Sequence, residues 1–309
     1  MGTVMITGGT GMVGTQLSKM LLAKGYHVII LTRDASDVKD RLPGIEYANW
    51  NINTQTIDAG AISKTDHIIH LAGANVAEKR WTEKRKQEIV NSRTKTSVLI
   101  VKALTDIPNK VQTVVSASAM GWYGPDTPES KKNGFTEDAK ADNAFLGETC
   151  RLWEESIEPV TALGKRLVKF RTGIVLSREG GALAEFKKPI KGFVAAILGS
   201  GKQVISWIHI DDLCSMYLEA IENPKLNGAY NAVAPHPVTN KELTLTLARK
   251  IRGAVFLPIH IPSFALKIAL GEMSIEVLKS ATVSSSKIES SGFEFQYPTI
   301  DSALPNVIN

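Results

Sequence analysis

The chain has 309 residues, of which 43% are hydrophobic and 22% are charged, as in ordinary soluble globular proteins. Its formal net charge is +5, but the only dense basic run, KRWTEKRK, contains an acid and predicts a solvated helix face rather than a nucleic-acid site. Two cysteines exclude a disulfide framework and fit a reducing cytoplasm, and no Cys/His cluster has metal-ligand spacing. Because no apolar run reaches the roughly 18 residues of a membrane span and a strand is expected directly after Met1, neither a membrane segment nor a signal peptide is predicted.

The first half of the chain alternates short β-branched runs with amphipathic segments. Apolar residues from Val13 to Leu21 recur at helical spacing, and Gly25 is placed to end that helix. Strands are expected at 3–7, 27–32, 67–73, 111–118, 166–176 and 228–233, and helices at about 83–104, 212–222, 240–251 and 262–279. This order, with continuously apolar strands, predicts an α/β fold with a doubly wound parallel sheet of the Rossmann type.

A glycine-rich run, ITGGTGMVG, lies between the first strand and the first helix and places Gly8, Gly11 and Gly14 in the pattern T-G-x-x-G-x-x-G. Gly8 permits a tight turn, Gly11 lets the backbone approach a pyrophosphate, and Gly14 lets the helix press on the sheet. Met12 and Val13 begin the helix, whose N–H groups and dipole receive negative charge. The run therefore predicts a dinucleotide site, and the alternative is a glycine turn without a ligand.

The end of the second strand selects between NAD and NADP. An NAD site needs an acid there for the ribose 2′-hydroxyl, whereas an NADP site needs a small neutral residue and a nearby arginine for the 2′-phosphate. Thr32 occupies the acidic slot and Arg33 follows it, which favours NADP(H). The alternatives are that Asp34 takes the acidic role or that Arg33 is only solvated.

After residue 176 the alternating pattern loosens, and the tail from 235 is punctuated by prolines. We predict a dinucleotide-binding domain formed by 1–178 and 205–234, and a smaller C-terminal substrate domain formed by 179–204 and 235–309. Because no flexible linker separates them, the smaller domain is expected to pack on the sheet.

Several longer stretches resemble one known family. The SAS…YG segment at 116–124, with the glycine pattern, is similar to the extended short-chain dehydrogenase/reductase superfamily. More specific stretches are HLAGANV, NSR, FLGETCRLWE, RTGIVLSREGGAL, SWIHIDDL and GFEFQYPTIDSAL. Together they resemble the atypical YfcH-like family of sugar-nucleotide epimerases, which has its own short C-terminal domain. The resemblance runs from residue 3 to about 304 and implies NADP binding and epimerase- or dehydratase-like oxidoreductase chemistry.

The resemblance implies cofactor contacts beyond the glycine turn and Arg33. These contacts are Leu71, Ala72, Gly73, Glu88, Arg93 and Val175. Glu88 and Arg93 lie on the helix after the 67–73 strand, where both could also be ordinary surface charges. Val175 would lie near the nicotinamide, although a core valine needs no such role.

The tyrosine that exchanges the proton in the wider superfamily is missing. An ordinary tyrosine has a pKa of roughly 10, and a lysine one helical turn later lowers it. None of the six tyrosines has a lysine at that spacing. In the corresponding helix Phe145 or Leu146 stands for the tyrosine, and Thr149 or Cys150 stands for the lysine. This departure puts the superfamily's route of proton transfer in question.

Ser118 and Tyr123 are the predicted catalytic residues. Ser118 matches the superfamily's active-site serine, which hydrogen-bonds the reacting oxygen; the alternative is a strand-end serine bonded to the backbone. Tyr123 would overlook the nicotinamide, with a packing role as its alternative. Glu148 would serve as an acid only if burial raised its pKa, and Cys150 is expected to be an inert thiol because no histidine lies nearby in sequence.

The stretch WIHIDDL offers His209 as a substrate-facing residue, with a structural histidine as the alternative. Asp211 and Asp212 are expected to cap the next helix rather than bind a metal. Trp207 is expected in the core.

The predicted function is therefore an NADP(H)-dependent epimerase-family oxidoreductase that transfers hydride to or from a small polar substrate, for which a nucleotide sugar is a candidate. Ser118 would orient the oxygen, and Tyr123 or a bound water would handle the proton. The alternative, favoured by the absent Tyr-Lys pair, is a non-catalytic NADPH-binding redox sensor or partner-binding protein. The sequence predicts neither the substrate nor the oligomeric state.

Overall fold

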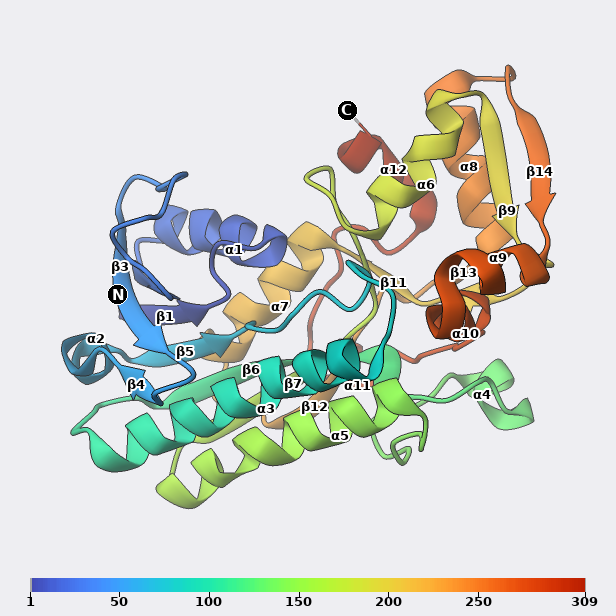
Figure 1. Cartoon of the computed structure of the whole chain (residues 1–309). Helices are drawn as coiled ribbons and strands as arrows, with labels where there is room; N and C mark the ends of the chain where they lie inside the picture. The colour runs from blue at the N-terminus through green and yellow to red at the C-terminus, as the bar shows by residue number, and fades with distance from the viewer. Residues whose placement is uncertain (1, 309) are drawn as a thin grey trace.

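The computed structural model describes residues 2–308, within which eight strands form one sheet in the order β12-β7-β6-β5-β1-β2-β3-β4 (Figure 1). These strands are β1 (Thr3–Thr7), β2 (His27–Thr32), β3 (Ile45–Asn51), β4 (Thr56–Ile57), β5 (His67–His70), β6 (Thr113–Ala119), β7 (Arg166–Thr172) and β12 (Gly228–Ala232). All neighbours are parallel except β3 and β4. The strand order reverses beside β1, so the predicted doubly wound α/β fold is confirmed.

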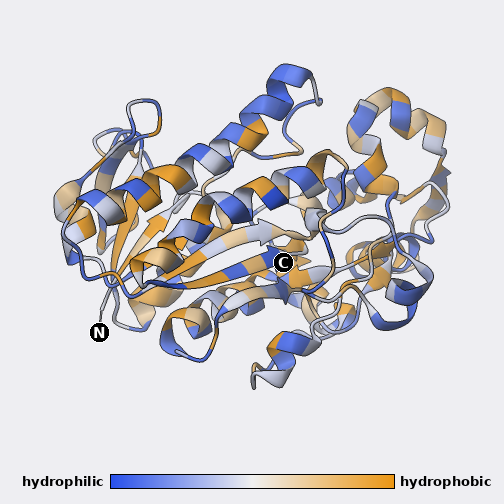
Figure 2. Ribbon diagram, turned by 90° about the horizontal axis from the view of Figure 1, so that it is seen from below, coloured by the Kyte–Doolittle hydropathy of each residue, from blue (hydrophilic) through white to orange (hydrophobic). Residues whose placement is uncertain are grey.

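Helices cover both faces of this sheet. α1 (Met12–Ala23) and α7 (Ile210–Glu222) pack on one face, and α3 (Glu83–Asp106) and α5 (Phe145–Ile157) lie side by side on the other (Figure 1). Leu17 and Leu213 belong to the first core, and Leu99 and Ile157 to the second. The covering helices alternate orange and blue segments in Figure 2, as expected for helices with one buried stripe.

The strands end in register at the carboxyl edge of the sheet. Thr7 of β1 lies opposite both Leu31 of β2 and His70 of β5. The loops that follow β1, β2 and β5 therefore meet at this edge, beside the point where the strand order reverses. Ligands of open α/β sheets bind at such a point.

A smaller C-terminal domain lies beyond the carboxyl ends of β7 and β12, on the right in Figure 1. Its core packs α6, α8 and α12 around Trp207 and the parallel pair β9 and β14. The remaining elements are α2 (Ala59–Lys64), η1 (Met120–Trp122), α4 (Pro128–Asn133), η2 (Glu158–Leu163), β8 (Ile174–Leu176), α6 (Ala182–Lys191), β9 (Val194–Leu198), β10 (Val204–Ile205), β11 (Trp207–His209), β13 (Val238–Thr239), α8 (Asn240–Arg252), β14 (Leu257–Ile261), α9 (Ser263–Leu270), η3 (Gly271–Met273), α10 (Ser274–Leu278), α11 (Ser286–Ser290) and α12 (Ile300–Ile308). The division of the chain at particular residues stays a prediction.

The strand predicted at 166–176 is wrong as a single element, because Gly173 divides it into β7 and β8. The Gly173 N–H donates to the carbonyl of Ala232, and the next N–H donates to the carbonyl of Ser206. The chain thus leaves the main sheet and pairs with β11. A Cβ on Gly173 would lie 2.6 Å from the Ser206 carbonyl oxygen, so this crossing requires glycine.

Two further differences have local causes. The helix predicted at 262–279 is interrupted at Gly271, whose φ of +61° ends α9. β3 was not predicted because exposed polar residues interrupt its apolar pattern. Within residues 2–308, no helix combines the length and the apolar content needed to cross a membrane.

Candidate functional site

The glycine turn connects β1 to α1 at the carboxyl edge of the sheet. Gly8 has a φ of +70°, and a Cβ there would lie 3.0 Å from the backbone nitrogen of Ala72. A Cβ on Gly14 would lie 2.4 Å from the Gly8 carbonyl oxygen, so the helix presses directly on the turn. A Cβ on Gly11 would meet only that oxygen, at 3.3 Å. The outer side of the turn is therefore open to a ligand.

The amino end of α1 lacks an internal anion. α1 has no side-chain hydrogen bond at its N-cap and no acid in its first turn, whereas Asp58 and Thr82 cap α2 and α3. The N–H groups at Met12 and Val13 and the positive end of the helix dipole are thus available to negative charge. This chemistry fits a pyrophosphate.

Thr7 and His70 hold the ends of β1 and β5 together. The Thr7 hydroxyl oxygen accepts from the N–H groups of Leu71 and Ala72 at 3.2 Å and lies 2.7 Å from Nδ1 of His70. Burial lowers the pKa of His70 to about 3, so the imidazole is neutral, and its Nε2 lies 3.2 Å from the Ser97 hydroxyl. The backbone at Leu71 and Ala72 is thereby fixed beside the glycine turn.

Arg93 lies beneath the loop that follows β5. Its guanidinium stacks over Trp153 at 4.9 Å and donates to the carbonyl of Ala74 at 3.1 Å. A Cβ on Gly73 would lie 3.1 Å from Cζ of Arg93, and burial lowers the pKa of this arginine. Arg93 therefore positions the loop backbone, and its direct contact with a cofactor stays a prediction.

A cavity of about 630 Å³ lies between α3 and the end of β3. Its lining residues are Arg33, Trp50, Asn51, Ile52, Asn53, Lys84, Gln87, Glu88, Asn91, Ser92 and Lys95. The structure thus brings Arg33 and Glu88 together, and Arg85 holds the Glu88 carboxylate at 2.8 Å and lowers the pKa of Glu88. Asp34 is outside this lining, and its carboxylate accepts from the backbone and hydroxyl of Ser36. The geometry favours Arg33 over Asp34 as the residue facing a ribose 2′-substituent.

The remaining cofactor candidates lie at the same edge. Thr32 is the last residue of β2 and precedes Arg33. A Cβ on Gly181 would lie 3.3 Å from Cε of Met12 and 3.7 Å from the carbonyl oxygen of Val175. Met12 and Val175 therefore approach each other across the start of α1, while Val13 packs against the core below.

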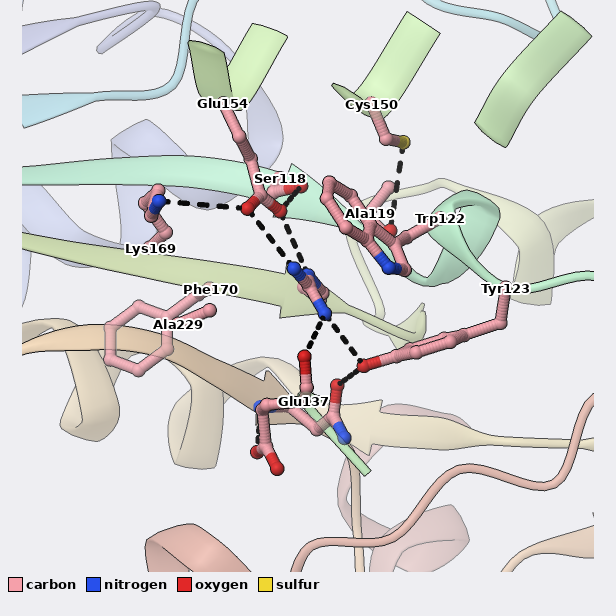
Figure 3. Close-up of polar contacts among 12 residues, drawn as sticks. Ser118, Ala119, Trp122, Tyr123, Glu137, Cys150, Glu154, Lys169, Phe170 and Ala229 are labelled. Carbon is pink, nitrogen blue, oxygen red and sulfur yellow. Dashed lines mark hydrogen bonds and ion pairs between the residues drawn. The ribbon is translucent and has the colours of Figure 1, made fainter. Parts of the chain in front are cut away.

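Ser118 belongs to a buried polar cluster behind the end of β6 (Figure 3). Its hydroxyl donates to the Glu154 carboxylate at 2.8 Å, and Arg171 donates to the same carboxylate at 2.8 and 3.2 Å. Exposed fractions are 3% for Ser118, 5% for Glu154 and 3% for Arg171. Lys169 lies 3.7 Å from Glu154 and 2.6 Å from Glu158, which is half exposed. A line of charged groups therefore joins Ser118 to the surface.

Glu154 and Arg171 were not predicted as site residues. Glu154 could have been found, because it follows Gly147 and Cys150 on one helical face that is otherwise apolar or small. An acid on such a face needs a buried partner. That the partner is Arg171, on β7, follows only from the sheet order.

Tyr123 is fully buried in the same cluster. Its hydroxyl donates to the side-chain oxygen of Asn231 at 2.6 Å and accepts from Arg171 at 3.2 Å. Its ring stacks on Phe135 with centroids 5.1 Å apart. Burial raises the pKa of Tyr123 to about 12, and the geometry favours the packing alternative.

Of the residues that could stand at the superfamily's Tyr-Lys positions, Leu146 and Cys150 pack against the end of β6 and the turn that follows it. A Cβ on Gly121 would lie 3.1 Å from Cβ of Leu146, and the Cys150 thiol lies 3.6 Å from the Ala119 carbonyl. Burial raises the pKa of Cys150 to about 12, as expected for an inert thiol. Glu148 is half-exposed and bonded to Arg151, which lowers the pKa of Glu148. Neither residue replaces the missing acid.

His209 caps α7 and is fully buried. Its Nδ1 accepts from the N–H of Asp211 at 3.1 Å, and its Nε2 lies 3.1 Å from the side-chain oxygen of Asn306. The ring packs on Tyr297 with centroids 3.8 Å apart, and burial lowers the pKa of His209. Asp212 accepts from the Tyr297 backbone. These contacts connect α7 to the C-terminal domain and favour the structural alternative.

Known proteins resemble this chain along almost its whole length. Residues 4–145 match the NAD dependent epimerase/dehydratase family, and residues 261–307 match a domain of unknown function, DUF1731. The chain is 36% identical over 306 residues to the epimerase family protein YfhF of Bacillus subtilis, covering 99% of this chain and 97% of that protein. The chain belongs to the epimerase family. The family resemblance predicted from the sequence is confirmed.

Other members of the epimerase family agree. The epimerase family protein SSP1921 of Staphylococcus saprophyticus is 37% identical over 308 residues, covering 99% of both chains. The crystal structure of the human epimerase family protein SDR39U1 (isoform 2) with NADPH matches with a TM-score of 0.84 and 27% identity, covering 99% of this chain and 98% of that one.

Proposed function

We propose that this epimerase-family chain is an NADP(H)-dependent oxidoreductase that acts on a small polar substrate, with nucleotide sugars as the first class to test. The observation that carries the proposal is the cavity beside Arg33, at the same sheet edge as the open glycine turn. The pyrophosphate would lie at the amino end of α1, and the 2′-phosphate beside Arg33. The human relative crystallised with NADPH supports this choice of cofactor.

The bound cofactor would supply a nicotinamide for hydride transfer. Ser118 lies one residue before the carboxyl end of β6. In alcohol oxidation, the substrate hydroxyl would give its proton to the Ser118 oxygen while the Ser118 proton passes to the Glu154 carboxylate. In carbonyl reduction both proton transfers run in reverse. Glu154 would thus replace the missing tyrosine as the proton acceptor, and Tyr123 would act by positioning Arg171.

The proposal is tested by mixing the protein and NADPH with a panel of sugar nucleotides, ketones and aldehydes, and following the loss of NADPH absorbance. We expect turnover with at least one substrate class, and a drop of roughly 100-fold or more in Ser118→Ala. Glu148→Gln is the matched control, because Glu148 is a half-exposed acid on the same helix as Glu154 and is bonded to Arg151. Unchanged turnover in Ser118→Ala would remove the catalytic assignment.

A non-catalytic NADPH-binding sensor is the second candidate. It is supported by the apolar packing of Leu146 and Cys150, two of the candidates for the Tyr-Lys positions. NADPH that binds tightly but stays reduced against the whole panel would support this candidate over the oxidoreductase.

A further inference from the structure

One face of α3 supplies most of a wall of the cavity beside Arg33. Lys84, Glu88, Asn91 and Lys95 follow one another at steps of four, three and four residues, which places them in a row on the helix surface. The row spans about three helical turns, with Lys84 at one end and Lys95 at the other. Arg33 faces the same cavity from the end of β2.

The three cations of this cavity, Arg33, Lys84 and Lys95, make no direct pair within the described part of the protein, although the charge of Lys84 contributes to lowering the pKa of Glu88. Within residues 2–308, no hydrogen bond or ion pair holds the side-chain nitrogens of Arg33, Lys84 or Lys95. Glu88, the acid of the lining, is already held by Arg85 at 2.8 Å.

Neighbouring cations on α3 behave differently. Arg85 is bonded to Glu78 as well as Glu88, and Lys86 is paired with Glu272 at 2.7 Å. The side-chain nitrogens of the cations that face the cavity therefore keep their donors for an anionic ligand.

Two amides of the cavity, Asn51 and Asn91, have their side-chain oxygens occupied. The side-chain oxygen of Asn51 accepts from the N–H groups of Asn53 and Thr54 at 2.9 and 3.1 Å. The side-chain oxygen of Asn91 accepts from Gln87 at 3.0 Å. The NH₂ groups of Asn51 and Asn91 are thus left to donate to a ligand. Three cations and two amide donors suit a multiply charged oxyanion.

We propose that Lys84 and Lys95 are specificity-determining residues that act with Arg33 on the 2′-phosphate of the cofactor. A phosphate monoester carries a charge of roughly −1.5 to −2 at neutral pH, more than one arginine neutralises. Arg33 offers a planar pair of donors, and the lysines add flexible point charges from the opposite wall. The inference rests on the proposed NADP(H) site and adds Lys84 and Lys95 of α3 to the residues that bind the 2′-phosphate.

Calorimetric titration of NADPH and NADH into the wild type, Lys84→Ala, Lys95→Ala and the double variant tests this inference. Each single variant is expected to bind NADPH roughly 3- to 10-fold more weakly, and the double variant more than about 10-fold, because a partly exposed charge is lost each time. NADH affinity is expected to change less than about twofold, since NADH has no 2′-phosphate. Both lysines are exposed, so the variants should fold, which thermal unfolding verifies.

Lys102→Ala is the matched control. Lys102 lies on α3 beyond the cavity and is paired with Asp106. The substitution Lys102→Ala removes the same charge from the same helix, and we expect it to leave the affinities for NADPH and NADH unchanged. A general effect of net charge would instead weaken NADPH binding equally in Lys102→Ala and Lys95→Ala, and would overturn the inference.

A second probe places the effect on the phosphate itself. Adenosine 2′-monophosphate carries the 2′-phosphate without the nicotinamide or the pyrophosphate, and its affinity should fall in Lys95→Ala while that of adenosine 5′-monophosphate does not. If the wild type prefers NADPH over NADH and both lysine variants keep that preference, the result overturns only the role of the lysines. A wild type that binds neither NADPH nor NADH overturns the cofactor site as well.

Discussion

Replacing Glu154 by glutamine should destabilise the protein strongly, because it leaves Arg171 charged and unpaired inside the fold. The two side chains are 5% and 3% exposed, so solvent screens their interaction very little. Glutamine keeps one oxygen for Ser118 or Arg171 but turns the other acceptor into an NH₂ that faces the guanidinium. Breaking a buried pair in this way costs about 3–5 kcal/mol.

Urea unfolding followed by circular dichroism gives this loss as a change in midpoint at constant slope. Glu158→Gln is the control, because Glu158 bonds Lys169 at the half-exposed end of the same cluster and should cost less than about 1 kcal/mol. The double variant Glu154→Leu with Arg171→Met should lose less than the sum of its single changes, by about 1–3 kcal/mol. A loss below about 1 kcal/mol in Glu154→Gln, or strict additivity, would refute the buried-pair reasoning.

The other predictions concern single side chains. Arg33→Ala should weaken NADPH binding by roughly 10- to 100-fold and leave NADH nearly unchanged, and equal losses of both in calorimetry would contradict the 2′-phosphate assignment. Tyr123→Phe should cost about 1–3 kcal/mol in urea unfolding because it removes the donor to buried Asn231, whereas a neutral effect would contradict that hydrogen bond. The pKa of His70 is about 3 in the folded chain and about 6.5 in the unfolded chain, so between these pH values only the unfolded chain binds the proton. The free energy of unfolding should therefore fall by about 1.4 kcal/mol per pH unit as the pH drops from 6.5 toward 3. The decline between pH 7 and 5 should be shallower in His70→Gln, and an unchanged slope would contradict the assignment.

The sequence predicts the sheet apart from β3 and β4, and it predicts the glycine turn proposed for the pyrophosphate, because both depend on local pattern. Continuous apolar runs mark strands buried on two faces. In the glycine pattern, Gly8 permits the tight turn, Gly11 leaves the backbone open to a ligand, and Gly14 lets the helix pack closely on the sheet. Breaks caused by a long-range contact are not visible in such a pattern. In the sequence Gly173 looks like one more position of an apolar strand. Only the structure shows that the carbonyl of Ser206 lies against it and that the strand breaks there.

The chemistry behind the cofactor site depends on pairs from distant elements, which sequence spacing does not reveal. Tyr123 and His209 were candidates for facing the nicotinamide and the substrate, yet the fold buries both and supplies Asn231 and Asn306 as their partners. Glu154 is the last residue of the stretch FLGETCRLWE, but its buried ion pair is formed with Arg171 on β7, which the sequence spacing does not reveal. Burial and partner identity come from tertiary packing, so the sequence indicated only Ser118 among the residues of the proposed proton route.

The position of a bound cofactor tests the account most directly. A crystal structure of this chain grown with NADP⁺ should show the pyrophosphate on the N–H groups of Met12 and Val13 and the 2′-phosphate beside Arg33. An adenosine that turns away from α3, or a glycine turn with no pyrophosphate at saturating NADP⁺, would contradict it.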